Sequence, residues 1–258
     1  MAMPITFGYA SDPGQVRENN EDAVAAFFSG VSNDNNRPPF GLFAVADGMG
    51  GHMNGEKASA VAIELLVDEV VRRVYLRLFT SDDEDFQLPI GEVMASALET
   101  ANDEINRNVP EGGTTITAVV VMGNLAYIAH VGDSRAYLVT DDEIEQITED
   151  HSFVNQLVKM GTMTAEEAEQ SGQTNKIYKA LGIAETVEVD TLTRRFKPGA
   201  RLLLCSDGLT GEIKDDVIQQ IVAEATTPQA ACDRLVAIAN DNGAQDNVTV
   251  AIVQMHGA

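Results

Sequence analysis

Four aspartates lie at the ends of apolar segments that have the composition of buried β-strands. Three of them follow such a segment and the fourth precedes one: Asp47, Asp133, Asp207 and Asp246. Carboxylates at the ends of buried strands are rigidly supported, as a preorganised ligand shell requires. Oxygen ligands suit hard cations such as Mg²⁺ and Mn²⁺ better than Zn²⁺ or Cu²⁺. The pattern therefore indicates a centre for Mg²⁺ or Mn²⁺.

A plainer explanation exists for each aspartate taken alone. Asp47-Gly48 and Asp207-Gly208 are also the common turn after a strand. Four such positions without neighbouring lysines are harder to explain as turns, because converging carboxylates repel one another strongly when no cation is bound. The glycine after Asp47 also lets the backbone turn closely, so the Gly48 carbonyl oxygen is a further candidate ligand.

The segment of residues 17–22 adds three charged side chains of interest. The run Arg17-Glu18-Asn19-Asn20-Glu21-Asp22 would ordinarily be a solvated loop. In the functional interpretation, the planar guanidinium of Arg17 binds a phosphate through its fork of donors. Glu21 and Asp22 then join the carboxylate centre, directly or through water.

Alternating and β-branched residues predict the strands that support these groups. The predicted strands are Ile5–Ala10, Ala23–Phe28, Phe40–Ala46, Thr114–Met122, Leu125–Val131, Arg135–Thr140, Val187–Arg195, Arg201–Cys205 and Asn247–Gln254. Short polar breaks at residues 122–125 and 139–143 predict hairpins. Residues 29–39 and 81–87 are predicted to be surface loops.

Apolar residues at spacings of three and four predict the helices. These helices are Gly55–Phe79, Leu88–Val109, Asp215–Ala225 and Pro228–Asn240, and a weaker pattern over Asp150–Ser171 is interrupted at Gly161. Strands joined by hairpins and helices gathered in pairs predict an α+β fold, in which helices cover antiparallel sheets. The element order disfavours the regular βαβ alternation of a Rossmann-like parallel sheet.

Composition narrows the class of partner and the location. The 258 residues carry 40 acidic and 17 basic side chains, a formal net charge of −23. This charge argues against nucleic acid and against an anionic membrane surface. Residues 1–6 lack the features of a signal peptide, and no apolar stretch is long enough to span a bilayer. We expect a cytoplasmic protein in which Cys205 is a buried, inert thiol.

Six segments that contain these residues occur in one order between residues 17 and 250. They are Arg17…Glu21-Asp22, Phe43-Ala44-Val45-Ala46-Asp47-Gly48-Met49-Gly50-Gly51-His52, Gly113-Thr114-Thr115, Val131-Gly132-Asp133-Ser134-Arg135, Cys205-Ser206-Asp207-Gly208-Leu209 and Asp246-Asn247-Val248-Thr249-Val250. Any one segment is weak evidence, whereas the ordered set is highly specific. Together they resemble the motif series of the PPM/PP2C metal-dependent serine/threonine phosphatases, and most of all the stand-alone bacterial members.

The resemblance implies one phosphatase domain over residues 1–258. Its fold would be a central antiparallel β-sandwich flanked by helices on both sides, a four-layer αββα arrangement. The segment at about residues 150–171 matches the flap, which is the family's variable substrate-contacting element. The implied substrates are proteins that a serine/threonine kinase has phosphorylated. We expect the chain to be a monomer.

The resemblance also implies a ligand set. Asp47 would bridge two metal ions, and the Gly48 carbonyl, Asp207 and Asp246 would complete their coordination. Water-mediated contacts would come from Glu21 and Asp22. The implied third metal site, which is weaker, is formed by Asp133 with Asp207, and the implied phosphate-binding group is Arg17.

Two-metal chemistry then gives a mechanism. A water shared by metals about 4 Å apart would become more acidic and would lie in line for attack on phosphorus, without a phospho-enzyme. The leaving alkoxide needs a proton, for which His52 is the candidate acid. Eukaryotic members carry a histidine directly after Asp-Gly, where this chain has Met49.

Three further positions bear on this interpretation. His151 is a second candidate acid, with an equal case for a capping or loop role, and His130 is expected to be structural. The pair Tyr178-Lys179 departs from the Thr-Arg that relatives often carry. That change should affect substrate approach or packing rather than the metals.

Other phosphate chemistries fail on their own requirements. A cysteine phosphatase needs an arginine six residues after its nucleophile, and Gly211 and Ile238 occupy that place after Cys205 and Cys232. Glu56 takes the lysine position of a P-loop. Two alternatives stay open from the sequence: an inactive member of the fold that acts as a binding module, and a phosphatase of small phosphate esters.

Overall fold

The computed structural model describes residues 5–29, 39–50, 53–80, 89–164, 167, 176–196 and 199–255. Several predictions concern residues outside this described part. They are the candidate acid His52, the loop at 81–87, most of the loop at 29–39, and residues 165–166 and 168–171 of the expected flap.

The described strands form two five-stranded sheets that face each other. The first has the order β1-β12-β11-β8-β9, and the second has the order β10-β7-β6-β3-β2. Their bounds are β1 Ile5–Asp12, β2 Ala23–Ser29, β3 Phe40–Ala46, β6 Ile116–Met122, β7 Leu125–Val131, β8 Arg135–Val139, β9 Ile144–Gln146, β10 Asp190–Arg195, β11 Arg201–Cys205 and β12 Val248–Met255. A small third sheet pairs β4 (Gly48–Met49) with β5 (Gly113–Thr114). Every pairing among the described strands is antiparallel.

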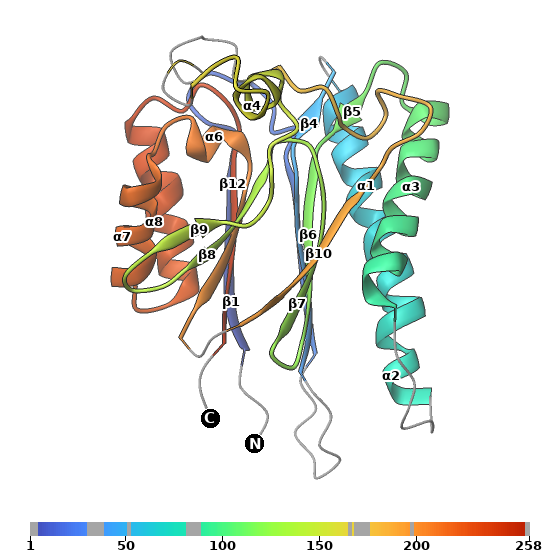
Figure 1. The fold of residues 1–258 in the computed structure, drawn as a ribbon, viewed down its shortest axis with the longest axis horizontal. Helices are drawn as coiled ribbons and strands as arrows, with labels where there is room; N and C mark the ends of the chain where they lie inside the picture. The colour runs from blue at the N-terminus through green and yellow to red at the C-terminus, as the bar shows by residue number, and fades with distance from the viewer. Residues whose placement is uncertain are drawn as a thin grey trace.

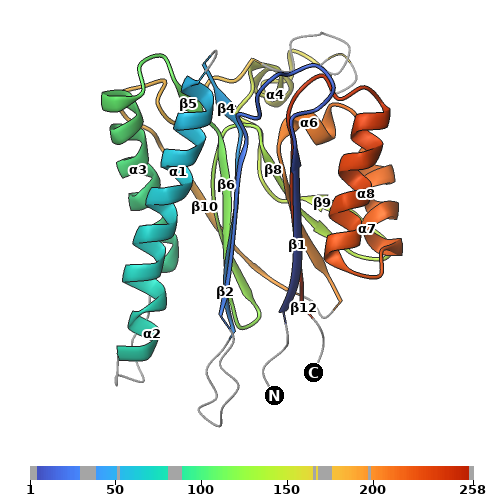
Figure 2. The ribbon, with the colours of Figure 1, turned by 180° about the vertical axis from the view of Figure 1, so that it is seen from behind.

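Helices cover the outer face of each sheet, as Figures 1 and 2 show from opposite sides. Two long helices, α1 (Asn54–Val70) and α3 (Ile90–Asn108), pack on the sheet that contains β3, β6 and β7. The other sheet is covered by α7 (Asp215–Glu224) and α8 (Pro228–Asp241). The predicted four-layer αββα sandwich is therefore confirmed. None of the helices in the described part is both long and apolar enough to cross a bilayer.

Strand alternation explains how one chain fills three apolar layers. In β11, Leu203 and Cys205 face the layer under α7 and α8, whereas Leu202 and Leu204 face the space between the sheets. Because successive side chains of a strand point to opposite faces, a strand covered on both faces is apolar throughout. Cys205 is fully buried, and burial raises the pKa of its thiol to about 12. The predicted inert thiol is thus consistent with its surroundings.

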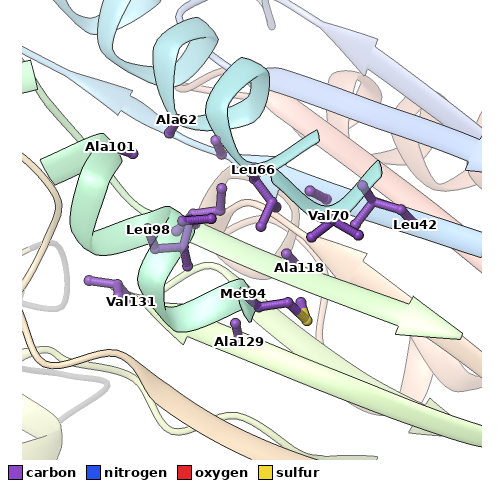
Figure 3. Close-up of a cluster of buried hydrophobic side chains, with 14 of the residues drawn as sticks. Leu42, Ala62, Leu66, Val70, Met94, Leu98, Ala101, Ala118, Ala129 and Val131 are labelled. Carbon is purple, nitrogen blue, oxygen red and sulfur yellow. The ribbon is translucent and has the colours of Figure 1, made fainter. Parts of the chain in front are cut away.

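A large cluster of buried apolar side chains lies between the second sheet and the helices α1 and α3. Figure 3 shows Leu66 of α1 together with Met94 and Leu98 of α3, all pointing toward the sheet. They meet Leu42 and Ala118 from β3 and β6. Small residues on the sheet let the large helix side chains approach closely, so the helices and the strands that end at the site form one rigid unit.

The structure differs from the predicted elements in a few places. The run expected as one strand at 114–122 is divided at Thr115, whose backbone N–H donates to the Asp47 carbonyl at 2.9 Å instead of joining a ladder. The helix expected at 55–79 passes through a wider turn at Val71–Tyr75 before the short helix α2 (Arg77–Thr80). Tyr75 at that turn packs edge-on against Phe27 at a centroid distance of 5.3 Å. Both predicted hairpins are present.

Candidate metal and phosphate site

The strand ends that carry the predicted aspartates lie at one end of the sandwich. Asp47 directly follows β3, and Asp22 directly precedes β2, whose first residue pairs with the last residue of β3. Asp133 lies in the turn between β7 and β8, and Asp207 follows the end of β11, where Cys205 pairs with the first residue of β8. Asp246 precedes β12. Antiparallel pairing thus brings five acids from distant parts of the sequence to one edge.

These carboxyl groups lie near enough to perturb one another. Burial raises the pKa of Asp47 well above its ordinary value, and the charges of Asp22 and Asp207 raise it further. Burial raises the pKa of Asp133 to about 8, with a further contribution from Asp207. The pKa of Asp207 is raised by burial and by Asp246. Carboxyl groups that are buried close together ionise with difficulty unless a cation offsets their charge. Raised pKa values in such a group are therefore typical of a cation site in the absence of its ion.

One carboxylate oxygen of Asp22 has no protein partner. Its Oδ2 accepts a hydrogen bond of 2.8 Å from the Ser206 hydroxyl. Its Oδ1 is buried and has no hydrogen-bond partner in the structure. Burial raises the pKa of this carboxyl to about 7. An unsatisfied buried carboxylate oxygen is costly, so a ligand that it can contact is expected there.

The carboxylates do not yet enclose an ion. Among the described residues, no three acidic, histidine or cysteine side chains converge tightly enough to hold one cation as they stand. At Asp246, Oδ2 accepts a 2.7 Å hydrogen bond from Arg17 Nη2. The donors are nevertheless all oxygen atoms, as Mg²⁺ and Mn²⁺ prefer. The residues therefore fit such ions in chemistry.

Backbone contacts fix the turn after Asp47. The Asp47 N–H donates to Thr115 Oγ1 at 3.0 Å, and the Asp47 carbonyl accepts from the Thr114 hydroxyl at 2.9 Å. Thr115 Oγ1 also lies 2.6 Å from Ser134 Oγ, next to Asp133. The two hydroxyls thus connect the turn of Asp47 with the turn of Asp133. This is the physical role of the Gly113-Thr114-Thr115 motif, which the sequence showed without a function.

Close packing holds Glu21 beside Gly48. A Cβ atom at Gly48 would lie 2.4 Å from the Glu21 carbonyl oxygen and 2.3 Å from that of Gly55, so only glycine fits. A Cβ atom at Gly55 would lie 2.5 Å from Glu21 Oε2. The Glu21 N–H donates to Asn247 Oδ1 at 2.8 Å. The predicted ligands Glu21 and Gly48 are therefore brought together, with Asn247 as an anchor that the sequence did not identify.

Comparison with known proteins agrees with this geometry. Residues 15–248 match the family described as Protein phosphatase 2C. The chain belongs to the protein phosphatase 2C family. It is thus a metal-dependent protein phosphatase of the PPM type, and the resemblance of its motifs is confirmed.

Several bacterial members of this family are similar over almost their whole length. The "Serine/threonine phosphatase stp" of Listeria innocua is 35% identical over 246 residues, which are 95% of this chain and 94% of that protein. The crystal structure of the Mycobacterium tuberculosis serine/threonine phosphatase PstP/Ppp has a TM-score of 0.81 and 35% identity, and covers 98% of this chain and 99% of the other. A structure of the PstP catalytic domain in complex with two manganese ions has a TM-score of 0.78 and 34% identity, with 98% and 100% coverage.

The two histidines of this phosphatase that lie in the described residues are buried and serve its scaffold. His130 Nε2 faces the Glu149 carbonyl at 3.0 Å, and its Nδ1 lies 2.9 Å from the Thr117 hydroxyl. Burial lowers the pKa of His130 to about 4, so it is neutral. His151 also has protein partners at both ring nitrogens, Gly132 and Asp190. Of the two roles left open for His151, the structure favours the structural one.

Two anchors of this PP2C site were visible in the motifs but had no role assigned. Ser206 Oγ binds Asp22 and also accepts the Thr249 N–H at 2.9 Å. Asn247 Nδ2 donates to the carbonyls of Pro13 and Asn19 at 3.0 and 2.9 Å. The sequence feature that could have identified these anchors is a small polar residue next to a key aspartate. Such neighbours orient ligands and hold the loop that carries them.

Proposed function

We propose that this phosphatase removes phosphate from phosphoserine and phosphothreonine in proteins, at a centre of two Mg²⁺ or Mn²⁺ ions with a third, weaker site. The observation that carries the proposal is the surroundings of Asp47, whose pKa is raised by burial and by the charges of four further aspartates, Asp22, Asp207, Asp133 and Asp246. One of these, Asp22, has a buried Oδ1 without a hydrogen-bond partner. The two manganese ions of the related PstP structure support it.

Each residue of the group has a proposed task. Asp47, the Gly48 carbonyl, Asp207 and Asp246 would hold the two ions. Glu21 and Asp22 contribute through water. Two ions held there would supply an acidified water for attack on phosphorus and would offset the charge of the phosphoryl group. Asp133 and Asp207 hold the third ion.

Two residues outside this ligand set act on the substrate. Arg17 is more than half exposed, with a side-chain exposure of 54%, so its guanidinium can reach both Asp246 and a phosphate at the surface. We assign to it the grip on the phosphate oxygens. His52, which lies outside the described residues, is the proposed acid for the leaving alkoxide.

The remaining proposals concern the chain as a whole. Residues 1–258 form one catalytic domain with a flap at about residues 150–171, of which α4 (Phe153–Lys159) is the described helix. We propose that the protein works as a monomer in the cytoplasm on the products of a serine/threonine kinase. The net charge of −23 supports the exclusion of nucleic acid and of anionic membranes as partners.

The test is hydrolysis of a phosphothreonine peptide and of p-nitrophenyl phosphate, in EDTA, Mg²⁺ or Mn²⁺. We expect turnover of both substrates with either metal, none in EDTA, and a higher kcat/KM for the peptide. Turnover of p-nitrophenyl phosphate alone would favour the phosphatase of small esters. A folded protein that binds Mn²⁺ by calorimetry but hydrolyses neither substrate would favour the inactive binding module.

Replacing Arg17 by alanine should raise KM for the phosphopeptide and change kcat little, because Arg17 binds phosphate alike before and during reaction. Loss of a charge-assisted contact corresponds to about a tenfold to hundredfold fall in kcat/KM. The Arg17→Lys variant should recover only part of it, since lysine lacks the planar fork.

The matched control is Arg72→Ala, which removes an exposed arginine of the turn Val71–Tyr75 that pairs with Asp68 near the end of α1. Its kinetics should be those of the wild type. If Arg17→Ala instead raised the affinity for Mn²⁺ and left KM unchanged at saturating metal, Arg17 would be a partner of Asp246 and not a phosphate ligand.

A further inference from the structure

A chain of hydrogen bonds runs from Lys179 to the turn that carries Asp133. Lys179 Nζ donates to Asp190 Oδ1 at 2.7 Å. Asp190 Oδ2 lies 3.2 Å from His151 Nε2, and the Gly132 N–H donates to His151 Nδ1 at 2.9 Å. Because Nδ1 accepts this bond, the neutral ring carries its proton on Nε2, which donates to Asp190. The carboxylate therefore fixes the tautomer that the Gly132 N–H needs.

The backbone of Gly132 depends on His151 at both of its polar groups. Besides the bond to the ring, the His151 N–H donates to the Gly132 carbonyl at 2.8 Å. Gly132 has a φ of +115°, and a Cβ atom there would lie 2.5 Å from the Thr115 side chain. The turn is thus in a conformation that few residues adopt. One residue, His151, holds it from one side while Thr115 limits it from the other.

His151 is itself held rigidly. Its side chain is only 3% exposed. Its ring stacks on His130 at a centroid distance of 4.9 Å and meets Tyr178 edge-on at 5.8 Å. The Tyr178 N–H donates to the His151 carbonyl at 2.8 Å. A ring that contacts two aromatic side chains and is bound at both nitrogens can transmit a defined position to the turn that it binds.

We propose that His151, oriented by Asp190, is a positioning residue for Asp133, the ligand of the weakest metal site. The proposal rests on the metal centre of the proposed function. Groups that lie behind a metal ligand generally set the direction of that ligand, and the loss of such a group weakens metal binding. Lys179 is the outer end of this chain of contacts.

Two variants separate the ring's two contacts. In His151→Asn, the side-chain oxygen lies near the place of Nδ1 and can still accept the Gly132 N–H. In His151→Gln, the amide lies near the place of Nε2 and keeps only the contact with Asp190. Calorimetric titration of the metal-free proteins with Mn²⁺ should show that the glutamine variant binds the weakest ion about tenfold to a hundredfold more weakly. The asparagine variant should stay close to the wild type, and both should keep the tighter binding.

Asp190→Ala is the second test, with Glu188→Ala as its control. Asp190→Ala should weaken the same Mn²⁺ event, because the ring loses the acceptor that orients it. Glu188 lies two residues earlier and contacts Lys179 only through its carbonyl, so Glu188→Ala should have no effect. Thermal melting of each metal-free variant establishes that it is folded. Should His151→Gln fail to fold, the pair at positions 190 and 188 decides the matter.

The outcomes distinguish this proposal from the function that it rests on. Equal affinities of the asparagine and glutamine variants for the weakest ion would overturn the positioning role and leave the metal centre intact. A wild type that binds two Mn²⁺ ions and no third would also overturn it, because Asp133 would have no ion to hold. A wild type that binds no Mn²⁺ would refute the metal centre itself. In ¹⁵N-labelled metal-free protein, a proton on His151 Nδ1 would contradict the contact with Gly132 independently of any metal.

Discussion

Asp207→Asn should lose metal-dependent hydrolysis by about a thousandfold or more, the scale on which single catalytic groups contribute. The same change should make the metal-free protein more stable than the wild type. Asparagine keeps the shape of the side chain and an oxygen for contacts, but it has no charge to offer a cation. Since burial and Asp246 raise the pKa of Asp207, its carboxylate is a strained group when no metal is bound.

Both effects have direct measurements. Hydrolysis of the phosphothreonine peptide is measured with saturating Mn²⁺, and thermal unfolding is measured in EDTA. The control is Asp142→Asn, at an exposed aspartate of the β8–β9 hairpin, where activity and melting temperature should not change. Near-normal activity of Asp207→Asn would place the metal centre elsewhere. A lower melting temperature in EDTA would mean that protein partners, not cations, satisfy this carboxylate.

The positions of the key acids could be predicted because their local signals are strong. The run Leu202–Cys205 is apolar on both faces, so it had to be a doubly covered strand, and the first carboxylate after it had to emerge at the sandwich edge. The same reasoning applies to Asp47 after β3. The pairing of β6 with β7 and of β8 with β9 then follows from hairpins at residues 122–125 and 139–143, which are short-range features.

The features that could not be predicted from the sequence depend on contacts between distant segments. Thr115 leaves the strand because the Asp47 carbonyl, 68 residues earlier, takes its N–H. The pairing of Arg17 with Asp246 joins positions 229 residues apart. The first depends on the pairing of β3 with β6, and the second joins the loop after β1 to the residues before β12. No local pattern encodes such pairings between distant strands. The role of His151 was undecided for the same reason, since its partners Gly132 and Asp190 come from two different strand ends.

The metal-free protein should become less stable as the pH rises above about 6.5, whereas the protein with Mn²⁺ should not. Asp22 and Asp133 have folded-state pKa values of about 7 and about 8, against an ordinary value of 3.8. An acid whose pKa is raised by folding contributes stability below its ordinary pKa. That contribution is lost as the pH rises through the folded value.

His130 acts in the opposite direction and defines the window for the measurement. Its pKa falls from 6.5 to about 4 on folding, so it destabilises the fold only as the pH drops below 6.5. Above that pH the raised carboxyl groups give the slope its negative sign, and the buried thiols of Cys205 and Cys232, whose pKa is raised from 9.0 to about 12, add to it with the same sign as the pH nears 9. Each proton that the folded state retains and the unfolded state lacks lowers the free energy of unfolding by about 1.4 kcal/mol per pH unit.

Cation binding reverses this trend because the ligands must then be ionised. Urea unfolding at about pH 6.5, 7.5 and 8.5, in EDTA and in Mn²⁺, should show a gap between the two conditions that widens with pH. Calorimetry in buffers of different ionisation enthalpy should show that Mn²⁺ uptake at pH 7 releases protons. The variant Asp22→Asn should flatten the pH slope in EDTA, because it removes one of the retained protons. A free energy of unfolding in EDTA that rises across this window would mean that the aspartates around Asp47 are already ionised, and that their mutual repulsion is relieved by protein groups and not by a metal.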